Sequence, residues 1–500
     1  MTLHDLFLVS PEAAMAALGL VVLLVDIIVP RRGVAAIVAF VGLVVPLALT
    51  VALFGSLEPD GAVENTGVFA NSLSLDRFSL FFKFFFIGVV AIVILMSTDY
   101  VRKFDTFRAE FYSLLLFSTT GMMLMASTRD LISIYISLEL SALPLAAMAA
   151  FLRDGRSSES GMKFLVLSGV SSALLLYGMV LLYGFTGTVQ LDEIAMRLGQ
   201  IDLSAEEPFG SYALLAAVVL MIAGFGFKIA AFPFHMWAPD VYEGAPTPVT
   251  AFLSVASKAA GFAVILRVFY VAFSLDVLSV EWSTIFAVLS VASMTIGNLV
   301  AIAQSNIKRM LAYSTIAHAG YILVGLASVT ARTGDDSVLG PASVLFYLSG
   351  YAVMNLAAFA AIIAITNRIN SDHIDDFAGM GRRAPYLAAV LTFALISLTG
   401  IPPTVGFVGK LFLFSAAIEA DLAWLVLAGV LNSVVGAYYY LRVVKAMYFT
   451  APPQGAEQVP SALPMRAALL VTAAGVLAFG IYPAWLMDAA RSAVALLLPA

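Results

Sequence analysis

Four charged residues lie inside stretches of sequence that are otherwise almost entirely apolar. Lys258 stands in the run Val249–Tyr270, and Glu139, Lys228 and Lys410 have comparable surroundings. A charged group at membrane depth is so costly that it marks, by default, a site of ion or proton movement. Glu139 and Lys258 fall near the middle of their segments, so the sequence predicts a row of ionisable groups in the membrane plane. Such a row relays protons if water links its members.

Other ionisable residues in apolar surroundings have competing interpretations. A lone lysine or arginine close to a membrane boundary usually extends its charge to the interface, so Lys83 and Arg267 are interpreted as interfacial or structural anchors. His235 and His318 fit a packed core histidine and a proton relay equally well. The roles of these four residues depend on how the segments around them are arranged.

The composition indicates the environment in which those segments fold. Of the 500 residues, 61% are hydrophobic and only 12% are charged, and the mean hydropathy is +0.99. Soluble domains carry about one-quarter charged residues. The sequence therefore predicts a polytopic membrane protein, and its spans must be helices because backbone groups cannot stay unpaired in lipid.

Apolar runs near the bilayer length of about 20 residues number about fourteen. They begin near Leu8, Val34, Leu75, Phe111, Leu131, Gly161, Tyr212, Val249, Trp282, Lys308, Ser343, Tyr386, Leu422 and Arg466. Two of them, the seventh and the twelfth, are interrupted by proline. Pro233 follows Lys228, and Pro402–Pro403 precedes Lys410 in a run too long for one span, so both are predicted to be discontinuous helices.

These two interruptions suggest an internal repeat. Helices four to eight form one group of five and helices nine to thirteen another, with the broken helix fourth in each group. Five is odd, so the second group enters the membrane inverted. We expect one integral membrane domain, 1–500, divided into N-terminal helices (1–110), a first repeat (111–275), an inverted second repeat (276–448) and a C-terminal helix (449–500).

The loops between these helices indicate an orientation. Basic residues cluster in alternate connections, which the positive-inside rule places in the cytoplasm: Arg31 and Arg32; Arg102, Lys103 and Arg108; Arg153, Arg156 and Lys163; Lys308 and Arg309; and Arg368, Arg382 and Arg383. Both termini are then predicted on the outer, periplasmic side of a bacterial cytoplasmic membrane. We interpret residues 8–29 as a retained helix and not as a signal peptide.

Several classes of function are disfavoured. The chain has no cysteine, which excludes disulfides, thiolate-bound iron–sulfur clusters and cysteine zinc sites. The presence of only four histidines disfavours a metal cluster, and a net charge of −6 gives no indication of nucleic-acid binding. No glycine-rich nucleotide fingerprint lies between a strand and a helix. If the protein takes part in redox chemistry, the electrons travel elsewhere.

Specific strings add a resemblance to a known family. Phe227–Thr250, which reads FKIAAFPFHMWAPDVYEGAPTPVT, closely resembles the signature of the subunit N family of bacterial NADH:quinone oxidoreductase, respiratory complex I. Phe252–Phe262, Lys308–Tyr321 and Leu398–Lys410 are also similar to that family, and the resemblance covers nearly the whole chain. It implies a proton-translocating, antiporter-like membrane subunit that couples electron transfer from NADH to quinone to proton pumping.

The resemblance also implies roles for the singled-out residues. By this similarity Glu139 and Lys228 form a charge pair, Lys258 is the central relay and Lys410 is the terminal lysine of the proton path. His235 and His318 match family positions as possible relays. The resemblance implies no cofactor in this chain, with FMN and iron–sulfur clusters in partner subunits. Expected partners are the other membrane subunits, including antiporter-like neighbours, while quinone and NADH are handled by other subunits.

Three alternatives remain open at this point. The related subunit of multisubunit cation/proton antiporters shares the fold and the lysines, but there a Leu-Pro-Asp-Ala string usually follows the tryptophan of helix seven, where this chain has Ala238–Gly244. An autonomous solute transporter would need a polar pocket near Pro402, which the sequence does not suggest. The cyanobacterial and plastid form of the subunit differs in its electron donor, which the sequence does not report.

Overall fold

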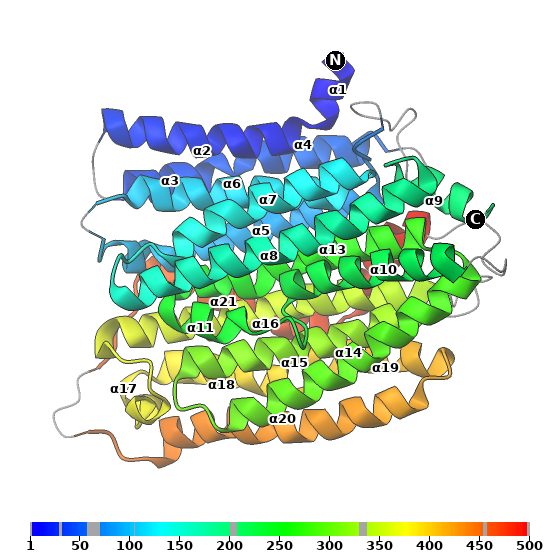
Figure 1. Ribbon diagram of the computed structural model, residues 1–500. Coiled ribbons are helices and arrows are strands. Elements are labelled where there is room, and N and C mark those ends of the chain that lie inside the picture. The colour runs from blue at the N-terminus through cyan, green and yellow to red at the C-terminus, as the bar shows by residue number, and fades with distance from the viewer. Residues whose placement is uncertain are drawn as a thin grey trace.

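The computed structural model is a bundle of long helices that run side by side, with α2 along one edge of the view and α20 along the opposite edge (Figure 1). It describes residues 3–29, 33–57, 71–104, 106–200, 208–329, 338–453 and 458–497. Arg31 and Arg32, which entered the orientation argument, lie outside these ranges. Within them there is no β-strand, only three isolated bridges between loops.

The first half of the chain supplies the helices that carry Glu139, Lys228 and Lys258. Their bounds are α1 (Leu3–Leu8), α2 (Ser10–Ile28), α3 (Val34–Gly42), α4 (Val44–Gly55), α5 (Arg77–Val101), α6 (Arg108–Ser127), α7 (Leu131–Ala149), α8 (Gly155–Thr186), α9 (Leu191–Leu198), α10 (Pro208–Ile229), α11 (Trp237–Gly244), α12 (Thr247–Phe252), the π-helical turn η1 (Leu253–Ser257), α13 (Lys258–Arg267) and the π-helical turn η2 (Val268–Ala272).

The second half carries His318 and Lys410. Its elements are α14 (Asp276–Ile302), α15 (Ile307–Ala327), α16 (Leu339–Ile369), the 3₁₀ turn η4 (Ile374–Phe377), α17 (Met380–Arg383), α18 (Pro385–Thr399), α19 (Val405–Glu419), α20 (Ala423–Phe449), α21 (Leu463–Ile481), α22 (Ala484–Val494) and η5 (Ala495–Leu497).

The described helices confirm an all-α polytopic membrane protein. Thirteen of them are long and apolar enough to cross a membrane, and the apolar pair α18 and α19 supplies a fourteenth, interrupted span. Helix seven is interrupted as well: α10 ends at Ile229 and α11 begins at Trp237. Each interruption contains a cis peptide bond before a proline, Phe232–Pro233 in one and Pro402–Pro403 in the other.

The two groups of five spans repeat the same neighbours. In the first group α6 packs on α7, α7 on α8 and α8 on the broken helix α10; in the second, α14 packs on α15, α15 on α16 and α16 on the broken helix α18. Every residue from Thr247 to Tyr270, the stretch that carries Lys258, is buried within the bundle. The repeat therefore surrounds its central helix with protein and keeps it away from lipid.

Candidate proton pathway

The first part of the site is a lysine at the break of helix seven. Lys228 lies in the last turn of α10 and is 5% exposed. Its Nζ donates to Ser141 Oγ on α7 at 2.8 Å. Glu139, half-buried on the same helix α7, accepts a hydrogen bond from the Ser172 hydroxyl of α8. No salt bridge within 4.0 Å joins Glu139 to Lys228, so the two charges expected to pair interact through intervening groups.

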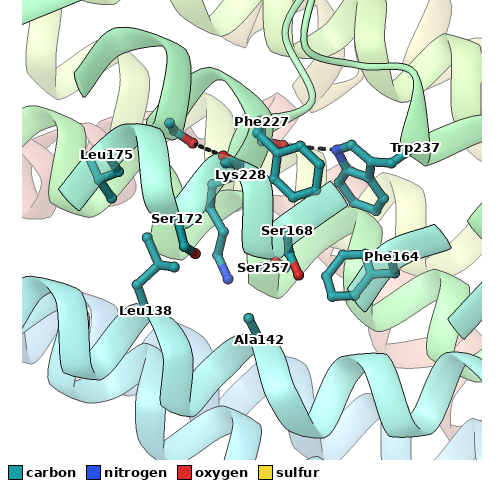
Figure 2. A pocket seen from close by; sticks show the side chains of 12 residues that line it. Leu138, Ala142, Phe164, Ser168, Ser172, Leu175, Phe227, Lys228, Trp237 and Ser257 are labelled. Carbon is teal, nitrogen blue, oxygen red and sulfur yellow. Dashed lines mark hydrogen bonds between the residues drawn. The ribbon is translucent and has the colours of Figure 1, made fainter. Parts of the chain in front are cut away.

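A small cavity lies beside the Lys228 side chain. Figure 2 shows Lys228 extending from α10 toward Leu138 and Ala142 of α7, with Ser172 and Ser257 nearby. The cavity offers water ≈ 10 Å³, which is close to the minimum for one ordered molecule. Ser172, which lines it, also donates to Glu139. A single water with Ser172 can therefore connect the carboxylate to the ammonium.

Lys258 begins α13 directly after the π-helical turn η1. Single π-turns inside helices occur frequently at functional sites, because they shift the helix by one residue. Lys258 is 2% exposed, and its Nζ donates to the backbone carbonyl of Thr315 on α15 at 2.5 Å. One turn later, a Cβ on Gly261 would lie 2.8 Å from Ile229 and 3.1 Å from Lys228. Glycine at this position lets α13 approach the helix that carries Lys228.

His318 lies on α15, one turn beyond Thr315, and both ring nitrogens have partners. Nδ1 lies 2.8 Å from Tyr347 Oη and Nε2 lies 3.1 Å from Tyr440 Oη. The Tyr440 hydroxyl also contacts Ser314 Oγ at 2.5 Å. A neutral imidazole has one donor and one acceptor nitrogen, so a change of tautomer reverses the direction of these bonds. His318 is therefore integrated into a chain of exchangeable protons.

Lys410 lies beyond the break of helix twelve, on α19. Its Nζ donates to the backbone carbonyl of Thr399 at 2.9 Å and to Ser433 Oγ on α20 at 3.1 Å. The ammonium also lies 4.4 Å from the centre of the Tyr321 ring. Gly400, which ends α18 with φ +93°, lies against it: a Cβ there would be 3.3 Å from Lys410 Nζ. The C-terminus of α18, where helix dipoles favour cations, thus faces the lysine.

Hydroxyl and amide groups extend this part of the site into α14 and α20. Ser433 Oγ donates to Tyr321 Oη at 3.3 Å, and Asn298 of α14 donates to the Asn432 carbonyl at 3.1 Å. The sequence interpretation missed these residues, as it missed Ser141 and Ser172. Polar side chains inside apolar spans were the available signal, because each costs free energy in lipid unless it is paired.

We call Glu139, Lys228, Lys258, His318 and Lys410 the polar row. They lie on α7, α10, α13, α15 and α19. Helix α10 packs on α13 and α15 packs on α19, while hydrogen bonds from Lys228 and Lys258 join α10 to α7 and α13 to α15. His235 lies close by, in the break of helix seven, 5% exposed and with its ring 5.3 Å from that of Phe232. Its Nδ1 has no hydrogen-bond partner.

Two further ion pairs lie buried outside the polar row. Lys83 of α5 pairs with Glu12 of α2 at 2.9 Å, with both side chains at most 3% exposed. Arg267, at the end of α13, donates to both carboxylate oxygens of Asp76 at 2.9 and 3.1 Å. Lys83 and Arg267 are therefore buried within ion pairs. This arrangement fits structural anchors, and neither side chain extends its charge to the membrane interface.

The Asp76 carboxylate also begins helix α5. It accepts the backbone N–H of Ser79, while the Ser79 hydroxyl contacts the Asp76 backbone in return, which forms a capping box. Burial would raise the pKa of Asp76, but the charge of Arg267 and hydrogen bonds from Arg267, Ser79 and Ser74 hold it below its ordinary value. This residue therefore fixes the start of α5 and the end of α13 together.

The chemistry available to the polar row is proton transfer. Within the described ranges, no three histidine or carboxylate side chains gather to hold a metal ion. What the core offers instead is ammonium, carboxylate and imidazole groups separated by hydroxyls and room for water. A helical bundle with such a row and two broken spans defines a class of membrane proteins that move ions across the bilayer.

Comparison with known proteins gives the family within that class. Residues 128–436 match the family described as NADH:quinone oxidoreductase/Mrp antiporter, TM. NADH-quinone oxidoreductase subunit N of Moorella thermoacetica is 44% identical over 99% of this chain and 100% of its own length. The same subunit of Dehalococcoides mccartyi is 45% identical over 86% of this chain and 88% of its own. The chain belongs to this NADH:quinone oxidoreductase/Mrp antiporter family.

A third relative has a different electron donor in its name. The protein named F(420)H(2) dehydrogenase subunit N, from Methanosarcina mazei, is 40% identical over 99% of this chain and 100% of its own length.

Solved structures share the fold over almost the whole chain. A chain of respiratory complex I from Thermus thermophilus is 30% identical, with a TM-score of 0.77 over 96% of this chain and 99% of that one. A chain of the Mrp complex from Dietzia sp. is 22% identical with a TM-score of 0.84, covering 99% of this chain and 98% of that one. The latter shows a common fold only.

Proposed function

We propose that this chain is a proton-translocating membrane subunit of NADH:quinone oxidoreductase, of the subunit N type. The observation that carries the proposal is the polar row, in which ionisable side chains on five helices, joined by packing or by hydrogen bonds, lie among hydroxyls inside an apolar bundle. The similarity to proteins named subunit N, along the full length of the chain, supports the choice of this complex over a free-standing antiporter.

The proposed mechanism starts at Glu139 and Lys228. A carboxylate near an ammonium stabilises the protonated form, and burial opposes it. When Glu139 is neutralised or moved, Lys228 gives up its proton through the adjoining water toward Lys258. The proton then continues past His318 to Lys410. Because Ser172 touches Glu139 and lines the cavity beside Lys228, a small movement of α8 is enough to alter this coupling.

Redox chemistry belongs to partner subunits in this proposal. The chain has no cysteine and thus no thiolate for an iron–sulfur cluster. We assign the clusters to partner subunits, and FMN with them on the similarity to proteins named subunit N. This chain contributes proton transfer to the catalysis of the whole complex. We further propose that it lies in a bacterial cytoplasmic membrane with both termini outside, on the basis of the basic residues in alternate loops.

The charge pair gives the direct test. Glu139→Gln and Lys228→Met in the assembled complex are expected to reduce proton pumping and coupled quinone reduction at least tenfold, because each removes one charge of the switch. Pumping by inverted membrane vesicles and complex content by native gel are the measurements. The exposed residues Glu419 and Lys445 provide matched controls as Glu419→Gln and Lys445→Met. Pumping at the wild-type level in both pair variants would rule out the assigned role.

The isolated chain gives a second test. Purified alone and reconstituted in liposomes, it is expected to show no NADH oxidation and no saturable Na⁺/H⁺ exchange, because its trigger lies in neighbouring subunits. Fluorescent pH and sodium indicators inside the liposomes measure the exchange. Saturable exchange by the chain alone would support the antiporter interpretation instead.

A further inference from the structure

Three buried polar atoms near Lys258 have no hydrogen-bond partner. They are the hydroxyls of Tyr242 and Tyr351 and the Nδ1 of His235. The residues are 0%, 2% and 5% exposed, respectively. Leaving a buried polar atom unpaired costs free energy, so such atoms in folded proteins usually mark a buried water or a functional site. Three unpaired atoms in one region of the bundle indicate a buried water or a functional site there.

Two of these atoms belong to neighbouring tyrosines on different helices. Tyr242 lies on α11 and Tyr351 on α16, close enough to interact electrostatically. The Thr315 side chain neighbours Tyr351, and its hydroxyl donates to the Leu311 carbonyl at 2.5 Å. The Thr315 oxygen could still accept from the tyrosine, but no hydrogen bond of normal geometry joins the two hydroxyls. The Thr315 carbonyl is the acceptor of Lys258. Tyr351 therefore lies beside the residue that holds the central lysine, and Tyr242 lies near Tyr351.

The same tyrosines adjoin both histidines. The ring of Tyr351 lies 5.1 Å from that of His318, and Lys258 is near enough to His235 and His318 to act on both electrostatically. A water bonded to the two hydroxyls would thus have Lys258 and the histidines as further neighbours. Two to four polar partners are what an ordered buried water requires.

The helix that carries Tyr242 leads from this place to a charged surface. Asp240, two residues before it, pairs with Lys163 at 2.8 Å and with Arg309 at 2.7 Å. Glu243, the next residue, pairs with Arg309 at 3.0 Å. These side chains line a surface pocket of ≈ 190 Å³. One short helix, α11, therefore has hydrated carboxylates on one face and the buried Tyr242 hydroxyl on another.

We propose that Tyr242 and Tyr351 hold a buried water through which Lys258 is loaded with protons from the side of the bundle where Asp240 and Glu243 lie. The inference rests on the proposed function, since it requires Lys258 to accept protons. In the loading step the water gives one proton to the neutral amine of Lys258 and regains one from the next water toward the charged pocket. The tyrosine hydroxyls only orient the water, so no covalent bond of a tyrosine breaks; the two transfers leave the water unchanged and move a net one proton to Lys258. They are positioning residues.

Phenylalanine substitutions test this assignment because they remove the oxygens and keep the rings. In the assembled complex, Tyr242→Phe and Tyr351→Phe are each expected to lower the pumping rate about tenfold, the value of one lost hydrogen bond in the rate-limiting relay. The double variant should lose little more than either single one, since both hydroxyls hold the same water. Tyr112→Phe is the matched control: that tyrosine is also 2% exposed but lies on α6.

A solvent isotope effect separates a relay from a structural role. If proton delivery limits the tyrosine variants, their turnover in deuterated water should fall further than that of the wild type and of the Tyr112→Phe variant. Wild-type pumping in both tyrosine variants would mean that the hydroxyls hold no water that takes part in proton transfer, and would overturn the proposal. If the variants fail to assemble, density for a water between the two hydroxyls of the wild-type complex decides, and its absence in a map that resolves other buried waters counts against us.

The outcome is distinguishable from failure of the proposed function. Loss of pumping on replacement of Lys258, together with unaffected tyrosine variants, would overturn only the proposal that the two tyrosines hold a water for Lys258. Full pumping without a titratable group at position 258 would overturn the function itself.

Discussion

Replacing Lys258 or Lys410 with arginine is expected to abolish most proton pumping although the positive charge is retained. Lysine can give up its proton in a buried site, whereas arginine keeps its proton at any accessible pH. Both lysines are at most 6% exposed, so a permanently charged side chain at either position is expected to stop proton transfer along the polar row. Lys258→His, which can still titrate, should retain more activity than Lys258→Arg. We expect the arginine variants to fall at least a hundredfold, as for the loss of a proton-transfer group.

The measurement is proton translocation at matched complex content, in vesicles energised by the electron donor. An arginine at position 445, where Lys445 is exposed on α20, is the control for the substitution itself. A structural lysine would give the opposite ranking, with arginine tolerated and histidine poor. Full pumping by both arginine variants would mean that the row stabilises charge without transferring protons.

Breaking the Asp76–Arg267 pair is expected to have the largest effect on stability. Both side chains are at most 9% exposed, and removal of one partner leaves an uncompensated buried charge, which costs about 3–5 kcal/mol. Asp76→Asn also weakens the start of α5. Thermal unfolding of the purified chain in detergent should show this loss for Asp76→Asn and Arg267→Met. Asp192→Asn, which breaks the more exposed pair with Arg129, should cost less than about 1 kcal/mol.

The pH dependence of that stability has a definite sign. Because the pKa of Asp76 is lowered in the folded protein, its contribution is complete above the ordinary carboxyl pKa and is lost as the pH falls through the folded value. The difference between the wild type and Asp76→Asn should therefore be constant at neutral pH and shrink only in strong acid. A difference that shrinks between pH 6 and pH 8 would show that another group is responsible. Combining Asp76→Asn with Arg267→Met should restore part of the stability.

Sequence reasoning located the breaks and the ionisable residues because both are local. A proline beside a lysine in an apolar run predicted the interruption between Ile229 and Trp237, and Pro402–Pro403 predicted the one between Thr399 and Val405. These signals need no knowledge of the partner helices.

The hydroxyls and the pairings could not be found in that way. In a membrane bundle the face of a helix toward lipid is as apolar as the face toward its neighbours, so the sequence pattern has no contrast to indicate what a serine or tyrosine contacts. Ser172 faces Glu139 only because α8 packs on α7. Lys83, interpreted as an anchor from its place near a helix end, is buried with Glu12, a partner from another helix. Such contacts depend on tertiary packing.

The two ends of the polar row hold their cations by different means, which has a consequence for control. Near Lys228 the counter-charge is Glu139, a group that can itself gain a proton or shift. At Lys410 the acceptors are the Thr399 carbonyl and the Ser433 hydroxyl, whose charges are fixed by covalent structure. Deprotonation of Lys410 therefore strands no anion in the membrane. In the proposed mechanism, an adjacent subunit can therefore act on two ionisable groups at the Glu139 end, whereas at the Lys410 end the lysine is the one group among its hydrogen-bonded neighbours that changes charge.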